Sequence, residues 1–152
     1  MNFYSVEGVL AEDIPHVWDE CWPHIRKSLE WYRNPGPQYT EAQFLQRLAD
    51  KTQQLWIGWN MAEHCVQGVM ITETNLHPDD PSQIYLFITI AGGKKWNDWG
   101  DDLWSLIKEW AIAKGCTHAV FAGRKGWGRL YGFDTLKTTP DGTAVMVRKL
   151  KG

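Results

Sequence analysis

Two clusters of basic side chains are the residues of this sequence best suited to chemistry. One cluster follows an apolar run over 84–90, and the other follows an apolar run over 117–122. If the two runs are neighbouring parallel strands, both clusters lie at one sheet edge, where open α/β sheets bind ligands. The clusters are Lys94 and Lys95, and Arg124, Lys125 and Arg129. They indicate a site for an anion, such as a phosphate compound or a nucleic-acid end.

Three carboxylates lie close to the first basic cluster and offer a second interpretation. Asp98, Asp101 and Asp102 follow Lys95 within one helical segment, so they can balance its charge. Exposed ion pairs of this kind are common on solvated surfaces and contribute little energy. The sequence therefore leaves two alternatives open, an anion site and a solvated basic rim.

Other reactive residues are more weakly placed. Glu73 lies in the second strand of a predicted hairpin, where it could face a cleft and act as a general base, or simply be solvated. Cys116 and His118 share a strand face, but a buried thiol and a strand-end imidazole are the preferred interpretation over a nucleophile pair. Cys21 and His24 lack a third and a fourth ligand, so we predict no metal site.

Hydrophobic periodicity predicts the elements that position these residues. Strands are expected over 3–10, 55–59, 66–74, 84–90, 117–122, 135–138 and 144–150. Helices are expected after the caps Asp13, Thr40 with Gln43, and Asn97 or Asp98, and a short helix is expected over 127–131. Pro23 should break or kink the first helix near its middle, and Gly115 should end the third in the left-handed conformation.

The run Ile84–Ile90 is apolar throughout, so we expect a central strand buried on both faces. A helix joins it to the strand over 117–122, which predicts a right-handed parallel crossover. The fold class is α/β (α+β), a mixed sheet with helices on both faces. Within the helix stripe, Trp110 is expected to be a core anchor, whereas Trp104 is the best candidate for a partner contact.

Length and composition agree with one domain over 1–152. The chain has 43% hydrophobic and 22% charged residues, with 16 Lys+Arg against 18 Asp+Glu, which gives a net charge of −2. This balance argues against bulk attraction to nucleic acid or to an anionic membrane. The 10 tryptophans indicate a rigid aromatic core or an aromatic surface. No membrane span, signal peptide or paired-cysteine motif is evident, so we expect a cytoplasmic protein with reduced thiols.

The order of elements over nearly the whole chain resembles the GNAT acyltransferase superfamily, and the later part resembles it most. The resemblance rests on the strand 84–90, a Gly-containing loop, the helix ending at Gly115, the strand 118–121, and Tyr131-Gly132-Phe133 before a final hairpin. It implies a GNAT-like sheet whose parallel pair splays at its C-terminal end, acetyl-CoA or CoA as cofactor, and transfer of acetyl to an unidentified amine. The Trp-rich segments 54–59 and 123–127 are similar to GNAT-like proteins of phages. The alternative is therefore a non-catalytic phage protein for virion assembly or host interaction, in the host cytoplasm or the virion.

The resemblance also implies site residues. The superfamily binds pyrophosphate through a Gln/Arg-x-x-Gly-x-Gly/Ala loop, which corresponds here to Lys95–Gly100, with Asp98 in place of the first Gly. The implied cofactor-binding residues are Ile90, Gly92, Lys94, Lys95, Gly100, Arg124 and Arg129. A general-acid Tyr is expected on the short helix, but Gly128 stands at that position, so Tyr131 is the nearest candidate. Glu73 and Tyr131 are therefore the two catalytic candidates, and we expect weak, salt-sensitive binding of CoA.

Overall fold

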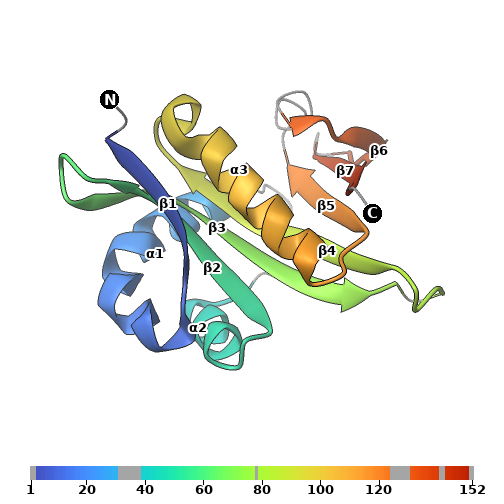
Figure 1. Cartoon of the computed structure of the whole chain (residues 1–152), viewed down its shortest axis with the longest axis horizontal. Helices are drawn as coiled ribbons and strands as arrows, with labels where there is room; N and C mark the ends of the chain where they lie inside the picture. The colour runs from blue at the N-terminus through green and yellow to red at the C-terminus, as the bar shows by residue number, and fades with distance from the viewer. Residues whose placement is uncertain (1–2, 31–38, 78, 124–130, 141–142, 151–152) are drawn as a thin grey trace.

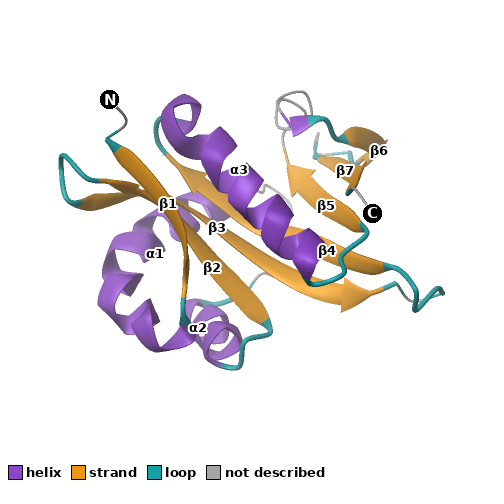
Figure 2. Cartoon of the chain, viewed as in Figure 1, coloured by secondary structure: helices purple, strands orange, loops and turns teal. Residues whose placement is uncertain are grey.

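A seven-stranded sheet with helices on both faces forms the centre of the molecule (Figure 1). The computed structural model describes residues 3–30, 39–77, 79–123, 131–140 and 143–150. The strands, in the order in which they lie in the sheet, are β1 (Tyr4–Val9), β2 (Gln53–Asn60), β3 (Cys65–Leu76), β4 (Ile84–Gly93), β5 (His118–Gly123), β7 (Ala144–Lys149) and β6 (Asp134–Thr138). The helices are the short 3-10 turn η1 (Ala11–Asp13), α1 (Ile14–Glu30), α2 (Glu41–Ala49) and α3 (Trp96–Ala113) (Figure 2).

The helices divide the core into two layers. On one face, α1 and α2 cover a cluster that includes Ile25, Phe44 and Ile71. On the other face, α3 covers a cluster that includes Leu103, Ile107 and Met146. The alternation along the strands explains this division, because successive strand side chains point to opposite faces. Helices on both faces of a mixed sheet confirm the predicted fold class.

The connection from β4 through α3 to β5 produces the only parallel pair among the described strands, as predicted. Residue pairs run from Tyr85–His118 to Ile88–Phe121 and then end. Strand β4 continues to Gly93 and remains paired with β3 on its other side. The two parallel strands therefore separate at their C-terminal ends, which confirms the predicted splay.

Several local predictions are also confirmed. The capping box of α2 forms in both directions between Thr40 and Gln43, and Gly115 has a φ of 87° after α3. Of the predicted break or kink at Pro23, the break is wrong, since α1 runs from Ile14 to Glu30 with Pro23 inside it. Pro23 and Asp19 are both exposed, so water can hydrate the carbonyl that the proline cannot bond.

Two further predictions need correction. Helix α3 begins at Trp96 and its N-cap is Lys95, with a φ of 57°, rather than Asn97 or Asp98. Strand β4 is central but not buried on both faces, because Tyr85 and Phe87 are half-buried. Of the predicted short helix over 127–131, only Tyr131 lies within the described residues. No helix in the described ranges combines the length and hydropathy that crossing a membrane requires.

Candidate functional site

The splay leaves one edge of β4 without a described partner. Beyond Ile88, none of the described β5 residues pairs with Thr89–Gly93. A register shift between Ile71 and Thr72 of β3 places a bulge at the same point, and Thr89 Oγ1 donates a hydrogen bond to the Ile71 carbonyl (3.0 Å). Bulges bend a strand away from its neighbour. The bulge is thus a local cause of the splay and of the exposed backbone edge.

This edge leads directly to the N-terminus of α3. The Lys94 amide donates to the Gln67 carbonyl (3.0 Å), and the Asp98 amide donates to the Lys95 carbonyl (2.9 Å). Backbone amides at a helix N-terminus point toward an incoming anion, and the helix dipole favours negative charge near them. The side chains of Lys94 and Lys95 are exposed beside them, and Asp98 is exposed in the same turn.

A buried tryptophan fixes α3 against the sheet. Trp99 is 1% exposed, and its ring covers the paired residues Gly58 and Gly68 of β2 and β3. A Cβ at either glycine would lie 2.4 Å from the indole. The indole Nε1 donates to the Lys94 carbonyl (2.9 Å), which also ties the ring to the loop before the helix. The orientation of the α3 N-terminus therefore depends on two glycines far away in the sequence.

The predicted loop glycine, Gly100, is covered by aromatic side chains. A Cβ on Gly100 would lie 2.7 Å from the Tyr131 hydroxyl and 2.8 Å from Cε3 of Trp96. The rings of Trp96 and Trp99 are 4.2 Å apart between centroids. Burial, and secondarily the Asp101 carboxylate, raises the pKa of Tyr131 to about 12. The phenol therefore keeps its proton at neutral pH and lies beside the first turn of α3.

Aromatic side chains also fill the splay on the α3 face. A cavity of about 20 Å³ lies there, lined by described residues alone. Its lining residues come from β3, β4, α3, β5 and the segment before β6, and they are Met70, Ile88, Ala91, Trp104, Phe121, Tyr131 and Phe133. Trp104 is 6% exposed and lies 5.5 Å from Phe133 between ring centroids. Trp104 was expected to contact a partner, and this expectation is wrong, because the residue is part of the core.

The predicted cofactor residues do not all face the same way. Lys94, Lys95 and Gly100 lie together around the α3 N-terminus. The side chain of Ile90 is buried in the cluster under α1 and α2, so only its backbone lies along the splay. Gly92 faces α1, where a Cβ would lie 2.7 Å from the His24 carbonyl. Arg124 and Arg129 lie outside the described residues.

Glu73 and Tyr131 are not brought together. Glu73 pairs with Phe87 across β3 and β4, upstream of the splay. Its carboxylate accepts long contacts of 3.5 Å from the Gln53 and Asn75 amides. In the ranges that the structure describes, no group of three or more His, Cys, Asp or Glu side chains could hold a metal ion.

Sequence reasoning missed the contacts that join α1 to the splayed strand. Ser28 Oγ donates to the Ala91 carbonyl (3.2 Å), and His24 Nε2 lies 3.1 Å from the Val66 carbonyl. Their spacing of four residues, which places them on one helix face, was the available signal. Nothing in the sequence identified β4 and β3 as the strands that they contact.

Neither a protein-family model nor a curated protein sequence matches the chain. Its architecture, however, is similar to that of several solved structures. Ard1 from Thermoplasma volcanium is similar with a TM-score of 0.66 at 14% identity, covering 99% of both chains. The ribosomal-protein-S5-alanine acetyltransferase from Vibrio fischeri has a TM-score of 0.67 at 11% identity, covering 99% of this chain and 95% of that one. A chain of the NatC complex bound to Gag peptide and CoA has a TM-score of 0.67 at 13% identity, covering 99% of this chain and 100% of that one. The chain has the fold of the GNAT superfamily, as its splayed parallel pair indicated.

Proposed function

We propose that this protein is an acetyl-CoA-dependent N-acyltransferase whose acceptor is an amine. The observation that carries the proposal is the backbone edge of β4 at Thr89–Gly93, which leaves β5 after Ile88 and runs to the N-terminus of α3. An extended ligand with an anionic end suits this arrangement, because strand edges offer backbone hydrogen bonds and helix N-termini favour anions. The GNAT fold of the chain agrees with such a ligand.

Particular residues would hold the CoA. The N-terminus of α3, with Lys94 and Lys95, would hold the pyrophosphate, and Arg124 and Arg129 are proposed to add positive charge. The bound cofactor would supply an activated acetyl thioester. Tyr131 lines the splay and, with its pKa raised to about 12 by burial first and by Asp101 second, holds a proton that it can donate there.

Asp98 opposes an anion at the same turn. It is exposed in the first turn of α3, and its carboxylate would repel a pyrophosphate. We therefore expect CoA to bind weakly, with an affinity that falls as salt rises. Asp98→Gly should strengthen binding, whereas Lys95→Gln should weaken it.

A second candidate, a non-catalytic GNAT-fold protein, is favoured by the filled splay. Among the described residues, Tyr131, Phe133 and Trp104 enclose a cavity of about 20 Å³ on the α3 face, less than one pantetheine arm needs. In this alternative the chain is a phage protein for virion assembly or host interaction. In either case we propose a reducing compartment such as the cytoplasm, because Cys21, Cys65 and Cys116 are free thiols.

Calorimetry with CoA and acetyl-CoA tests the proposal, with wild type, Asp98→Gly and Lys95→Gln at two salt concentrations. An affinity for CoA that increases in Asp98→Gly and decreases in Lys95→Gln supports the cofactor site. If neither wild type nor Asp98→Gly binds CoA, the basic residues are a solvated rim and the cofactor proposal is wrong.

A thiol-release assay then separates the two functions. Acetyl-CoA is supplied with spermidine, with a lysine-containing peptide and with a peptide bearing a free N-terminal amine. Release of CoA that depends on one of these amines, and that falls in Tyr131→Phe, supports the enzyme. Tight CoA binding with no amine-dependent release favours the non-catalytic protein.

A further inference from the structure

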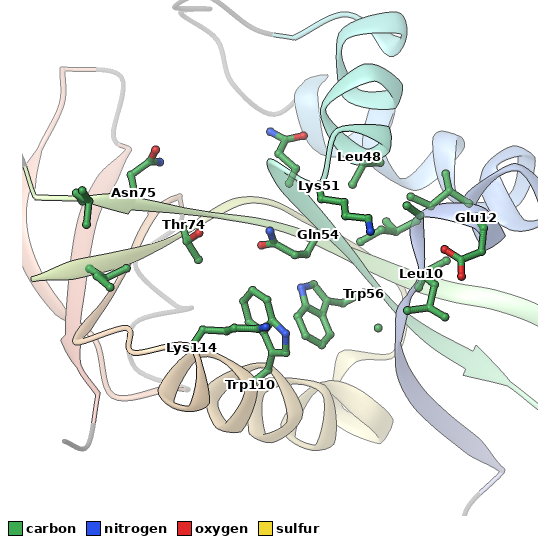
Figure 3. A pocket seen from close by; sticks show the side chains of 18 residues that line it. Leu10, Glu12, Leu48, Lys51, Gln54, Trp56, Thr74, Asn75, Trp110 and Lys114 are labelled. Atoms are coloured by element: carbon green, nitrogen blue, oxygen red, sulfur yellow. The ribbon is translucent and has the colours of Figure 1, made fainter.

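A cavity of about 870 Å³ lies at the end of the sheet opposite the splay (Figure 3). It is formed where β1 and β3 end and β2 and β4 begin, together with the C-terminal ends of α2 and α3. Ligand cavities of folded proteins commonly measure about 300–1,000 Å³. Its size therefore admits a small molecule, at a place that the proposed CoA site does not use.

The cavity exists because β1 is shorter than its partner. The last pair between the two strands joins Val9 to Leu55, so Gln53 and Gln54 of β2 extend beyond β1. After Val9 the chain turns away, closed by a hydrogen bond from the Asp13 amide to the Leu10 carbonyl (2.9 Å). The start of β2 stays paired with β3 on one side, and only the side where β1 would continue is open.

Two tryptophans form its aromatic floor. Trp56 and Trp110 meet edge to face, with ring centroids 5.3 Å apart. Trp56 is 4% exposed, whereas Trp110 is half-buried and presents ring surface to the cavity. Trp110 was expected to be a core anchor, and the structure corrects this expectation in part, because the residue packs on the core and also lines the cavity.

The rim is apolar and exposed. Leu10 and Leu76 line opposite sides of the cavity, and each is 62% exposed. Large apolar side chains left in water around a concavity are typical of binding sites. An aromatic floor between apolar rims favours a flat, apolar ligand body.

The charged residues at the cavity bear on the charge of the ligand that it could bind. Lys51 and Lys114 enter from the ends of α2 and α3, and Glu12 is the only described carboxylate in the lining. Lys114 Nζ lies 6.0 Å from the centre of the Trp110 ring. Lys51 has a φ of 64°, a left-handed conformation usually taken by glycine after a helix. The two ammonium groups offset Glu12 and the partial negative charge of the two helix C-termini. They are the groups of the cavity that could hold an anion attached to a flat ring.

Two amides supply hydrogen bonds. Trp56 Nε1 donates to Thr72 Oγ1 (2.9 Å), whose hydroxyl donates to Gln54 Oε1 (2.9 Å), so the Gln54 amide is held pointing into the cavity. Gln53 is 2% exposed, and its Oε1 has no hydrogen-bond partner within the described structure. Buried polar atoms are rarely left unsatisfied. A bridging water would satisfy this oxygen when an aromatic carboxylate, which has no donor of its own, occupies the cavity.

We propose that this cavity binds a small planar aromatic carboxylate, with its ring on Trp110 and its carboxylate between Lys51 and Lys114. The ring would replace water on the aromatic floor, and the carboxylate would accept hydrogen bonds from the two ammonium groups. The site lies at the C-terminal end of α3, so it does not depend on CoA binding at the other end of the same helix.

Calorimetry with 2-naphthoate on the whole chain tests this site. We expect a dissociation constant of about 0.1–1 mM, typical for a ligand of this size. The neutral analogue 2-naphthylmethanol should bind several-fold more weakly. Lys114→Gln should weaken 2-naphthoate by about 2- to 5-fold, as expected for an exposed ion pair, and Trp110→Leu should weaken it further while Trp110→Phe retains most of the affinity.

The matched control is Lys95→Gln, the same change at the other end of α3. It should leave 2-naphthoate binding unchanged, and Lys114→Gln should leave CoA binding unchanged, so the two sites are tested separately. Absence of 2-naphthoate binding overturns the proposal, as does an equal loss in Lys95→Gln and Lys114→Gln. Sedimentation of the ligand-free protein as a dimer that Lys114→Gln dissociates would also overturn it, because a second copy would then occupy the cavity.

Discussion

The contact between Gly58 and Trp99 predicts that Gly58→Ala destabilises the protein, and that the same substitution is neutral or stabilising once the Trp99 ring is removed. A Cβ on Gly58 would lie 2.4, 2.6 and 2.9 Å from three ring carbons of Trp99, with no other atom among its nearest contacts. The ring cannot move aside easily, because it is 1% exposed and its Nε1 is bonded to the Lys94 carbonyl. Gly58→Ala should therefore force a shift of α3 against the sheet.

The magnitude follows from two opposing terms. Overpacking a dense core costs about 1–3 kcal/mol. Replacing a strand glycine of ordinary φ by alanine returns about 0.4–1 kcal/mol, because the unfolded chain loses conformational freedom. We expect Gly58→Ala to lower the free energy of unfolding by about 1–2 kcal/mol, which corresponds to about 2–8 °C in Tm for a chain of this size.

In a Trp99→Leu background the clash is absent, so Gly58→Ala should be neutral or stabilising. Urea denaturation of the wild type, the two single variants and the double variant measures this coupling. If Gly58→Ala destabilises both backgrounds equally, the tryptophan is not the cause and our account of how α3 is positioned is wrong. The same variants test function, since a displaced α3 N-terminus should weaken CoA more than 2-naphthoate.

Three further predictions concern thiols, a phenol and a helix cap. Cys65 should react with a thiol reagent in the native protein while Cys21 stays protected, because burial first, and Glu20 second, raises the pKa of Cys21 to about 12. Equal rates of modification of the two thiols, followed by mass spectrometry, would contradict this. The free energy of unfolding should fall as pH rises from about 10 toward 12, because the Tyr131 phenol loses its proton at lower pH in the unfolded chain than in the folded protein, where its pKa is about 12. Tyr131→Phe should make the free energy of unfolding, measured by denaturation at high pH, fall less steeply with pH. An unchanged slope would argue against a buried phenol. Thr40→Ala should cost about 1 kcal/mol by removing the side-chain acceptor of the Gln43 amide, and a denaturation midpoint equal to that of wild type would refute the cap.

Local signals in the sequence predicted local structure well. The Thr40–Gln43 capping box, the left-handed Gly115 and the apolar run of β4 each depend on neighbours within a few residues, and each forms as expected. The order of elements also predicted the parallel pair of β4 and β5, because a helical crossover between strands permits little else.

The parts of the site that were missed depend on residues distant in the sequence. Periodicity places Trp104 between the buried and polar sides of its helix, and only the segment carrying Tyr131 and Phe133 decides that it is buried. The same applies to the cavity at the opposite end of the sheet. It exists because β1 ends at Val9, opposite Leu55, whereas β2 extends two residues further along the sheet, to Gln53. A difference in strand length between non-adjacent segments leaves no periodic signal.

Several of the tryptophans pack against glycines that are distant in the sequence or one turn away in the same helix. Indole rings in this protein repeatedly lie on glycines of a facing strand or an adjoining helix turn, where a Cβ would come within 3.0 Å of the ring. The pairs are Trp56 on Gly8, Trp99 on Gly58 and Gly68, and Trp96 on Gly100. Because each glycine provides the space that a large ring needs, these three of the 10 tryptophans and four of the 14 glycines act together in packing. The sequence shows how many there are of each, but the pairs appear only when the sheet is assembled, and two of the four glycine contacts fix the helix end that we propose to bind CoA.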